Sequence, residues 1–216
     1  ICVVVGHQAE EVKNTLGDKV SYALQKEQLG TGHGVLQAID FIPDHGDMII
    51  LYGDTPLITG KTLENMLRFH RENDNAVTVL SAILDDATGY GRIVRDEKGS
   101  FTKIVEHKDA TDEEKQIKEI NGGMYIFKSP LLKYSIAKID NNNTQKEYYL
   151  TDTVEILLKE GYNVDAMVTP DINDIFGVNS PIQLAESTTI MKSRINQMHM
   201  ENGVTLMDPL NTYIES

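Results

Sequence analysis

Short apolar runs alternate with segments of helical composition through the first part of the chain. Each run is rich in β-branched and other apolar residues, and it therefore predicts a buried strand. The predicted strands cover residues 1–6, 20–24, 48–52 and 76–84. The segments between them predict helices over residues 8–16, 35–39 and 59–70, with Thr59 as the N-cap of the last. This alternation favours a parallel α/β sheet with helices on both faces.

The pattern changes after Thr88. Residues 90–95 and 101–106 predict two strands joined by a turn at 96–99, and we expect this hairpin to form a lobe over one edge of the central sheet. The rest of the chain returns to longer elements. Strands are predicted over residues 122–127 and 164–168, and helices over residues 131–139 and 147–160.

A long helix is predicted over residues 180–202, where Ser180 is the cap and Pro181 the first helical residue. We interpret residues 1–202 as one domain that ends in this linker helix. Residues 203–216 resemble the entry to a further domain. Because the chain starts within an apolar run and without Met, we interpret it as a fragment of a longer protein.

The composition is that of a globular protein, and its charge excludes some partners. The chain has 216 residues and a net charge of −13. Nucleic acids and anionic membranes bind basic surfaces, so we expect neither partner. The only cysteine, Cys2, lies in an apolar run, and no stretch approaches the roughly 20 apolar residues of a membrane span. A chain without disulfides suits a reducing cytoplasm.

Tyr52-Gly53-Asp54 is the first candidate for chemistry, since it directly follows a predicted buried strand. Ligands of open parallel sheets bind beyond the carboxyl ends of the strands. A single carboxylate there suits Mg²⁺, which keeps few protein ligands beside water and substrate phosphates. Asp54 could equally be a turn residue beside Gly53 and Pro56.

The loop at residues 25–34 is the second candidate, because its glycines permit close approach of the backbone to a ring or phosphate. Gln25 and Thr31 could hydrogen-bond the edge of a base. The loop matches neither the dinucleotide-binding fingerprint nor a P-loop. Taken alone, it is better explained as a glycine-rich turn before a helix.

Three further polar residues lie at the ends of predicted strands or precede the long helix. Glu106 and Asn121 are polar residues in apolar surroundings and could converge on sugar hydroxyls or an amide. They could also be edge-strand polar residues that oppose aggregation. Asn179 could direct its carbonyl oxygen to a cation, or simply belong to the cap of the helix.

These candidates occur in order within longer motifs. The motifs are Leu24–His33, Leu51–Leu57, Thr88–Ile93, Ile104–Ala110, Glu119–Asn121, Asn141–Asn143, Glu147–Asp152 and Gly177–Asn179. Together they resemble the N-terminal pyrophosphorylase domain of the bacterial bifunctional N-acetylglucosamine-1-phosphate uridyltransferase/glucosamine-1-phosphate acetyltransferases. The likeness covers nearly the whole chain. It implies a Rossmann-like, GT-A-like nucleotidyltransferase fold: a mixed, mostly parallel sheet with helices on both faces and a β-hairpin lobe.

The resemblance also implies a reaction and a role for each candidate. UTP and N-acetylglucosamine 1-phosphate would give UDP-N-acetylglucosamine and pyrophosphate, with Mg²⁺ as cofactor. The implied metal ligands are Asp54 and Asn179, which would also be the catalytic residues. The implied substrate-binding residues are Gln25, Gly30 and Thr31 for uracil, Tyr52, Gly53 and Asp54 for the nucleotide, Asn179 beside them, and Gly91, Glu106 and Asn121 for the sugar.

The chain also departs from the family. The family's first strand, with its glycine-rich Gly-Thr-Arg loop and a later Pro-Lys, has no counterpart here, nor has the β-helix that carries acetyltransferase activity and forms trimers. Gly122 stands where the family usually has threonine. We therefore expect a trimeric parent, a monomeric or weakly associating fragment, and a cleft that recognises product better than it makes it. A non-catalytic binding or regulatory module, or a pyrophosphorylase for another sugar phosphate, are the alternatives.

Overall fold

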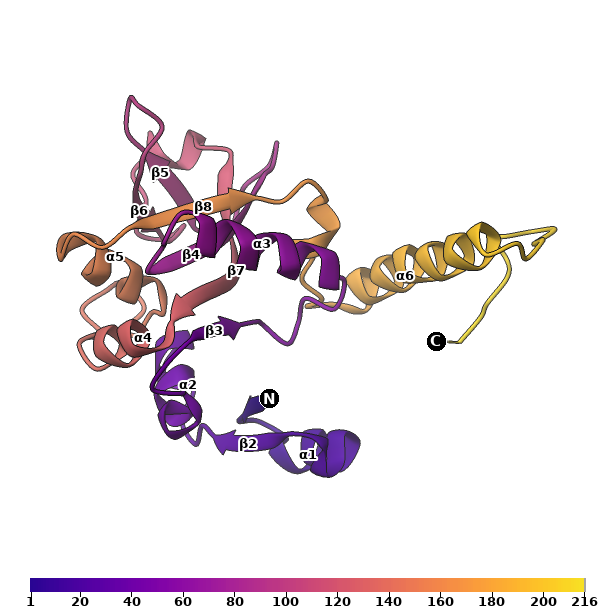
Figure 1. Cartoon of the computed structure of the whole chain (residues 1–216), viewed down its shortest axis with the longest axis horizontal. Coiled ribbons are helices and arrows are strands. Elements are labelled where there is room, and N and C mark those ends of the chain that lie inside the picture. Colours follow the sequence, from indigo (N-terminus) through magenta and orange to yellow (C-terminus); the bar gives the residue numbers. More distant parts are fainter. Residues whose placement is uncertain (216) are drawn as a thin grey trace.

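The computed structural model describes residues 1–215 as two sheets with helices packed around them (Figure 1). The strands are β1 (Cys2–Val5), β2 (Ser21–Leu24), β3 (Asp47–Ile50), β4 (Val77–Ile83), β5 (Arg92–Arg95), β6 (Phe101–Val105), β7 (Glu119–Lys128) and β8 (Val164–Val168). The α-helices are α1 (Ala9–Leu16), α2 (Thr31–Gln37), α3 (Gly60–Glu72), α4 (Ser129–Ile136), α5 (Thr151–Lys159) and α6 (Pro181–Glu201). Short 3₁₀ turns are η1 (Gly17–Lys19), η2 (Ile39–Phe41), η3 (Glu114–Gln116) and η4 (Ile172–Ile175).

The larger sheet has six strands in the order β6-β5-β7-β4-β8, and β3 also pairs with β7. Strand β7 is antiparallel to β3, β4 and β5, whereas β4 and β8 are parallel. It follows that β3, β4, β5 and β8 run in one direction and β6 and β7 in the other. The predicted mixed sheet is confirmed, with most strands in one direction although most neighbours pair antiparallel. The β5–β6 hairpin extends one edge of this sheet, as predicted.

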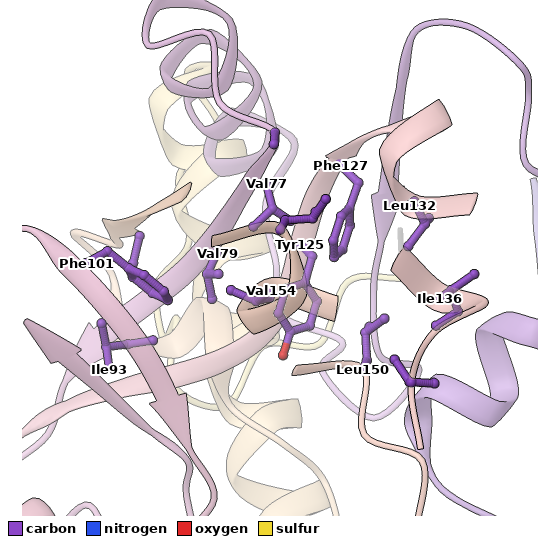
Figure 2. Packing of buried hydrophobic residues seen from close by; sticks show 14 of the residues in the cluster. Val77, Val79, Ile93, Phe101, Tyr125, Phe127, Leu132, Ile136, Leu150 and Val154 are labelled. Atoms are coloured by element: carbon purple, nitrogen blue, oxygen red, sulfur yellow. The ribbon is translucent and has the colours of Figure 1, made fainter. Parts of the chain in front are cut away.

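Helices cover both faces of the six-stranded sheet, as the alternating pattern predicted. On one face, Val77, Val79 and Phe127 pack with Leu132 of α4 and Val154 of α5 (Figure 2). On the opposite face a second core forms around Met66 of α3, with members from β4, β7 and η4. The side chains of a strand alternate between its two faces, which is how one strand can supply both cores.

The smaller sheet contains only β1 and β2, which are parallel and in register from Cys2 with Ser21 to Val5 with Leu24. Within residues 1–215, no ladder hydrogen bond joins it to the six-stranded sheet. Figure 1 shows this unit, with α1, at the end of the molecule beyond β3. Val4 and Leu24 are apolar residues of strand type, yet 38% and 45% of their surfaces stay exposed.

Most predicted elements are confirmed, and two helix starts were wrong. Helix α2 begins at Thr31 rather than residue 35, and α5 begins at Thr151 rather than residue 147. Both errors have one cause, since Tyr148 accepts a hydrogen bond from Gly32 N and donates one to Leu29 O, each at 2.8 Å. This contact with a distant loop holds residues 147–150 out of the helix.

Helix α6 projects from the body of the molecule (Figure 1). Its predicted cap is confirmed, because Ser180 Oγ accepts a hydrogen bond from Gln183 N at 3.2 Å. Arg194 ties the helix to the body by donating to Leu57 O at 2.6 Å and to Asp171 at 2.9 Å. Across residues 1–215, none of the helices is both long and apolar enough to cross a membrane.

Candidate functional site

A cleft of about 460 Å³ brings together residues from all four candidate motifs. Seven of the ten predicted site residues line it: Thr31, Tyr52, Asp54, Gly91, Glu106, Asn121 and Asn179. Gln25, Gly30 and Gly53 lie beside it without being among the lining residues. Segments more than one hundred residues apart in sequence therefore meet at this one place.

Asp54 and Asn179 lie close together in the lining of the cleft. The backbone carbonyl of Asp54 accepts a hydrogen bond from Val178 N at 2.7 Å, which joins the loop after β3 to the loop before α6. Gly177 lies between their side chains: a Cβ built on Gly177 would be 3.7 Å from Asp54 Oδ2 and 3.4 Å from Asn179 Nδ2. The carboxylate and the amide thus flank a small space that a larger residue at position 177 would fill.

Gly91, Glu106 and Asn121 meet at another part of the cleft. Asn121 N donates to Gly91 O at 2.9 Å, so β7 and the start of β5 are held together here. A Cβ on Gly91 would lie 3.3 Å from Glu106 Oε2 and 3.5 Å from Asn121 Cβ. The backbone of Gly91 can therefore approach a ligand that these two side chains also reach.

Glu106 is held in place from behind the cleft. Its Oε1 accepts a hydrogen bond from Thr151 Oγ1 at 3.1 Å. Burial raises the pKa of the Glu106 carboxyl, the Thr151 hydrogen bond lowers it, and the nearby charges of Asp109 and Glu147 raise it further. The carboxylate keeps free lone pairs that can accept hydrogen bonds from hydroxyl groups.

The loop before α2 is shaped by glycine and held by distant residues. Gly30 has φ 107°, and a Cβ there would lie 2.6 Å from Tyr148 O, so no other residue fits. Gln25 Nε2 donates to Gly30 O at 3.1 Å and lies 3.1 Å from His33 Nδ1. Thr31 Oγ1 accepts from Leu150 N at 3.1 Å. Gln25 and Gly30 thus shape the loop, and Thr31 is its member that reaches the cleft.

The segment 145–151 belongs to the site although no residue in it was assigned a role from the sequence. Gln145, Glu147 and Tyr149 line the cleft, while Leu150 and Thr151 bond to Thr31 and Glu106. The segment therefore connects the loop before α2 to the carboxylate at the end of β6. The motif Glu147–Asp152 was the signal that could have revealed it, but as a predicted helix it suggested only packing.

The cleft is acidic. Its lining residues include Asp54, Glu106 and Glu147, and among those within residues 1–215 there is neither lysine nor arginine. Burial raises the pKa of Tyr52 to about 12. A phosphate group entering this cleft would need a cation to offset the three carboxylates.

Comparison with known proteins gives a consistent set of relatives. The sequence profile of the nucleotidyl transferase family matches residues 1–189. The chain is 52% identical over 216 residues to the bifunctional protein GlmU of Acetivibrio thermocellus, and 53% identical over 214 residues to that of Thermoanaerobacter pseudethanolicus. It is 49% identical over 215 residues to that of Bacillus subtilis. The matches cover 99–100% of this chain and 47% of each relative, so the chain spans about half their length.

Two solved structures share the fold at low sequence identity. One is described as a glucose-1-phosphate thymidylyltransferase from Bacillus anthracis in complex with a sucrose, with a TM-score of 0.65 at 16% identity over 98% of this chain and 79% of that one. The other is a UDP-glucose pyrophosphorylase complexed with UDP-glucose, with a TM-score of 0.67 at 15% identity over 89% of this chain and 80% of that one. At these identities the likeness concerns the fold alone.

Proposed function

The chain belongs to the nucleotidyl transferase family, and we propose that it provides the uridylyl-transfer site that converts UTP and N-acetylglucosamine 1-phosphate to UDP-N-acetylglucosamine and pyrophosphate. One observation carries the proposal. The Asp54–Asn179 pair and the Gly91–Glu106–Asn121 group line a single cleft, so a ligand with a phosphate end and a sugar end can contact both.

The proposed roles follow the geometry of the cleft. Thr31 binds uracil directly, and Gln25 and Gly30 shape the loop that presents it. Tyr52 and Gly53 flank the nucleotide. On the sugar, Gly91 offers its backbone, Glu106 accepts from hydroxyl groups, and Asn121 binds the acetamido group.

Asp54 and Asn179 would hold a Mg²⁺ ion. The donor set fits, because a carboxylate and an amide oxygen are hard ligands and Mg²⁺ keeps its other positions for water and phosphate. When bound, the ion would supply the positive charge that the acidic cleft lacks.

The reaction requires positioning more than acid–base chemistry. An oxygen of the sugar phosphate attacks the α-phosphorus of UTP in line, the new P–O bond forms, and pyrophosphate departs with the electrons of the broken bond. No covalent enzyme intermediate is needed, and the side chains of the cleft contribute by holding both substrates in line. The Thr151 hydrogen bond to Glu106 serves this purpose by fixing the carboxylate that binds the sugar.

The largest effect on ligand binding is expected for Asp54→Ala. We expect the affinity for UDP-N-acetylglucosamine in Mg²⁺ to fall by at least about 10-fold and to become independent of Mg²⁺, because a metal ligand is lost. Isothermal titration calorimetry with and without Mg²⁺ measures this. The matched control is Asp44→Ala, which removes an exposed carboxylate paired with Lys133. Unchanged Mg²⁺-dependent binding by Asp54→Ala would disprove the metal assignment.

A second candidate function is a binding or regulatory module, and the acidic lining favours it because UTP carries more charge than the product. We expect this chain to bind UDP-N-acetylglucosamine more tightly than UTP. Turnover assays separate the catalytic function from the binding function. They pair UTP or dTTP with N-acetylglucosamine 1-phosphate or glucose 1-phosphate. Turnover with dTTP or glucose 1-phosphate would instead identify a pyrophosphorylase of another specificity.

The longer protein implied by the relatives is a further part of the proposal. We expect it to be a cytoplasmic homotrimer that also acetylates glucosamine 1-phosphate, whereas this chain is expected to be monomeric or weakly associated. Light scattering of both proteins tests the assembly, and an acetyl-transfer assay of the longer one tests the second activity.

A further inference from the structure

Strand β7 contains a bulge that brings two distant positions of one strand together. Val79 of β4 pairs with Tyr125, and Ser81 of β4 pairs with Asn121. The paired positions are therefore two residues apart on β4 but four residues apart on β7. In a regular strand, residues four apart would be separated by about 13 Å. Here Asn121 Nδ2 donates a hydrogen bond to the Tyr125 hydroxyl at 2.7 Å.

Glycines make this bulge possible. Gly123 has φ 75°, and a Cβ there would lie 2.7 Å from the Tyr52 ring. A Cβ on Gly122 would lie 2.6 Å from Ile175 Cγ2 and 2.8 Å from Leu80 O. A side chain at position 122 thus has no room here, since Ile175 and the Leu80 carbonyl fill that space.

The hydrogen bonds of the bulge leave Asn121 only one orientation of its amide. Gly123 N donates to Asn121 Oδ1 at 3.0 Å, and a backbone N–H can only donate, so the oxygen must face Gly123. Nδ2 then faces Tyr125, whose hydroxyl accepts. One N–H and one lone pair of the amide remain for a ligand, at fixed positions.

Tyr125 acts from behind the wall of the cleft. Its side chain is fully buried, it is not among the lining residues, and its ring packs beside Phe127 with centroids 5.9 Å apart. Figure 2 shows it among apolar side chains, with its hydroxyl oxygen at the end of the ring away from Phe127. The Tyr125 ring also lies beside that of Tyr52, with centroids 6.5 Å apart.

We propose that Tyr125 is a positioning residue that makes the site selective for a 2-acetamido sugar, by fixing the Asn121 amide. This inference rests on the proposed function. An acetamido group carries one N–H donor and one carbonyl acceptor in a rigid plane, so it needs the Asn121 donor and acceptor in fixed places. When the Tyr125 hydroxyl is lost, Gly123 still sets which end of the amide is oxygen, but nothing holds Nδ2 and the amide can tilt. A single sugar hydroxyl can rotate and serve as donor or acceptor, and it therefore tolerates a tilted amide.

The test is Tyr125→Phe, which keeps the ring and removes only the hydroxyl. We expect the Kd for UDP-N-acetylglucosamine to rise by about 3- to 10-fold, as for loss of one hydrogen bond, while the Kd for UDP-glucose changes by less than about 2-fold. Calorimetry of both ligands with the whole chain gives the ratio. Tyr134→Phe is the matched control, because it removes a tyrosine hydroxyl that bonds to Glu160 away from the cleft.

A second readout does not depend on any ligand. In ¹⁵N spectra of the ligand-free protein, the side-chain amide signals of Asn121 should shift and exchange faster with water in Tyr125→Phe, and they should be unchanged in Tyr134→Phe. Unchanged Asn121 signals, or an equal loss of affinity for both sugars, would overturn the inference. If the unmodified chain binds neither UDP-sugar, the proposed function and the selectivity fail together, while the Asn121 signals still decide whether Tyr125 fixes the amide.

Discussion

The two sheets of this molecule are built from similar apolar runs, yet only one forms a buried core. Tyr125, Ile126 and Phe127 of β7 are fully buried between neighbouring strands and the helices on both faces. The same kind of sequence in β1 and β2 leaves Val4 and Leu24 partly in water, and α1 contributes no buried residue. An apolar pattern therefore predicts a strand. The free energy gained by burying its side chains depends on how many neighbouring residues cover them.

Truncating one side chain in each sheet should give the largest difference. Phe127→Ala is expected to lower the free energy of unfolding by about 3–5 kcal/mol, because it leaves a cavity in a filled core. Val4→Ala should cost about 0.5 kcal/mol, as for other partly exposed positions. Urea denaturation followed by circular dichroism measures both. Equal losses would show that the smaller sheet is as well packed as the larger one.

A smaller effect is expected from adding one methyl group to glycines with different surroundings. Gly122→Ala in β7 should destabilise the fold by about 1–3 kcal/mol, since its Cβ would press against Ile175 and the Leu80 carbonyl. Gly60→Ala at the start of α3 is the control, because nothing lies within 4 Å of its Cβ and alanine favours a helix. It should be neutral or stabilising by up to about 1 kcal/mol. A neutral Gly122→Ala would mean that the bulge can move away from Ile175.

The smallest expected effect is on the pH dependence of stability, and it comes from a helix packed on the six-stranded sheet. Burial, aided by the nearby carboxylates of Glu155 and Asp140, raises the pKa of Asp152 in α5 to about 6, against about 3.9 in an unfolded chain. Between these two pKa values the folded state binds more protons than the unfolded chain does. The free energy of unfolding therefore falls as pH rises from about 4 to about 6, and it is level above about pH 6.

The variant Asp152→Asn should remove this dependence and raise the Tm at pH 7 by on the order of 2 °C. Thermal melts at pH 4, 5, 6 and 7 provide the measurement, and Asp112→Asn, at an exposed position, serves as the control. A variant whose melts keep the slope between pH 4 and pH 6 would place the titration elsewhere.

The sequence by itself located most of the elements and seven of the residues that line the cleft. Apolar runs and caps such as Thr59 and Ser180 are local signals, and the structure has a strand or helix at each predicted place. Asp54 was placed at a strand end and Glu106 was predicted to converge with Asn121, whereas the family resemblance joined all three in one site. Their roles in binding and catalysis stay predictions.

Only the tertiary structure decided how these elements meet. Tyr148 leaves its predicted helix because Leu29 and Gly32 bond to its backbone, and Thr151 reaches Glu106 from 45 residues away. Asn121 and Tyr125 meet through the bulge at Gly122 and Gly123 of β7, whose extent appears only in the pairing of β7 with β4. Local sequence determines which backbone conformations are favourable. Contacts between distant segments determine which residues are buried, which are hydrogen-bonded and which can hold a ligand.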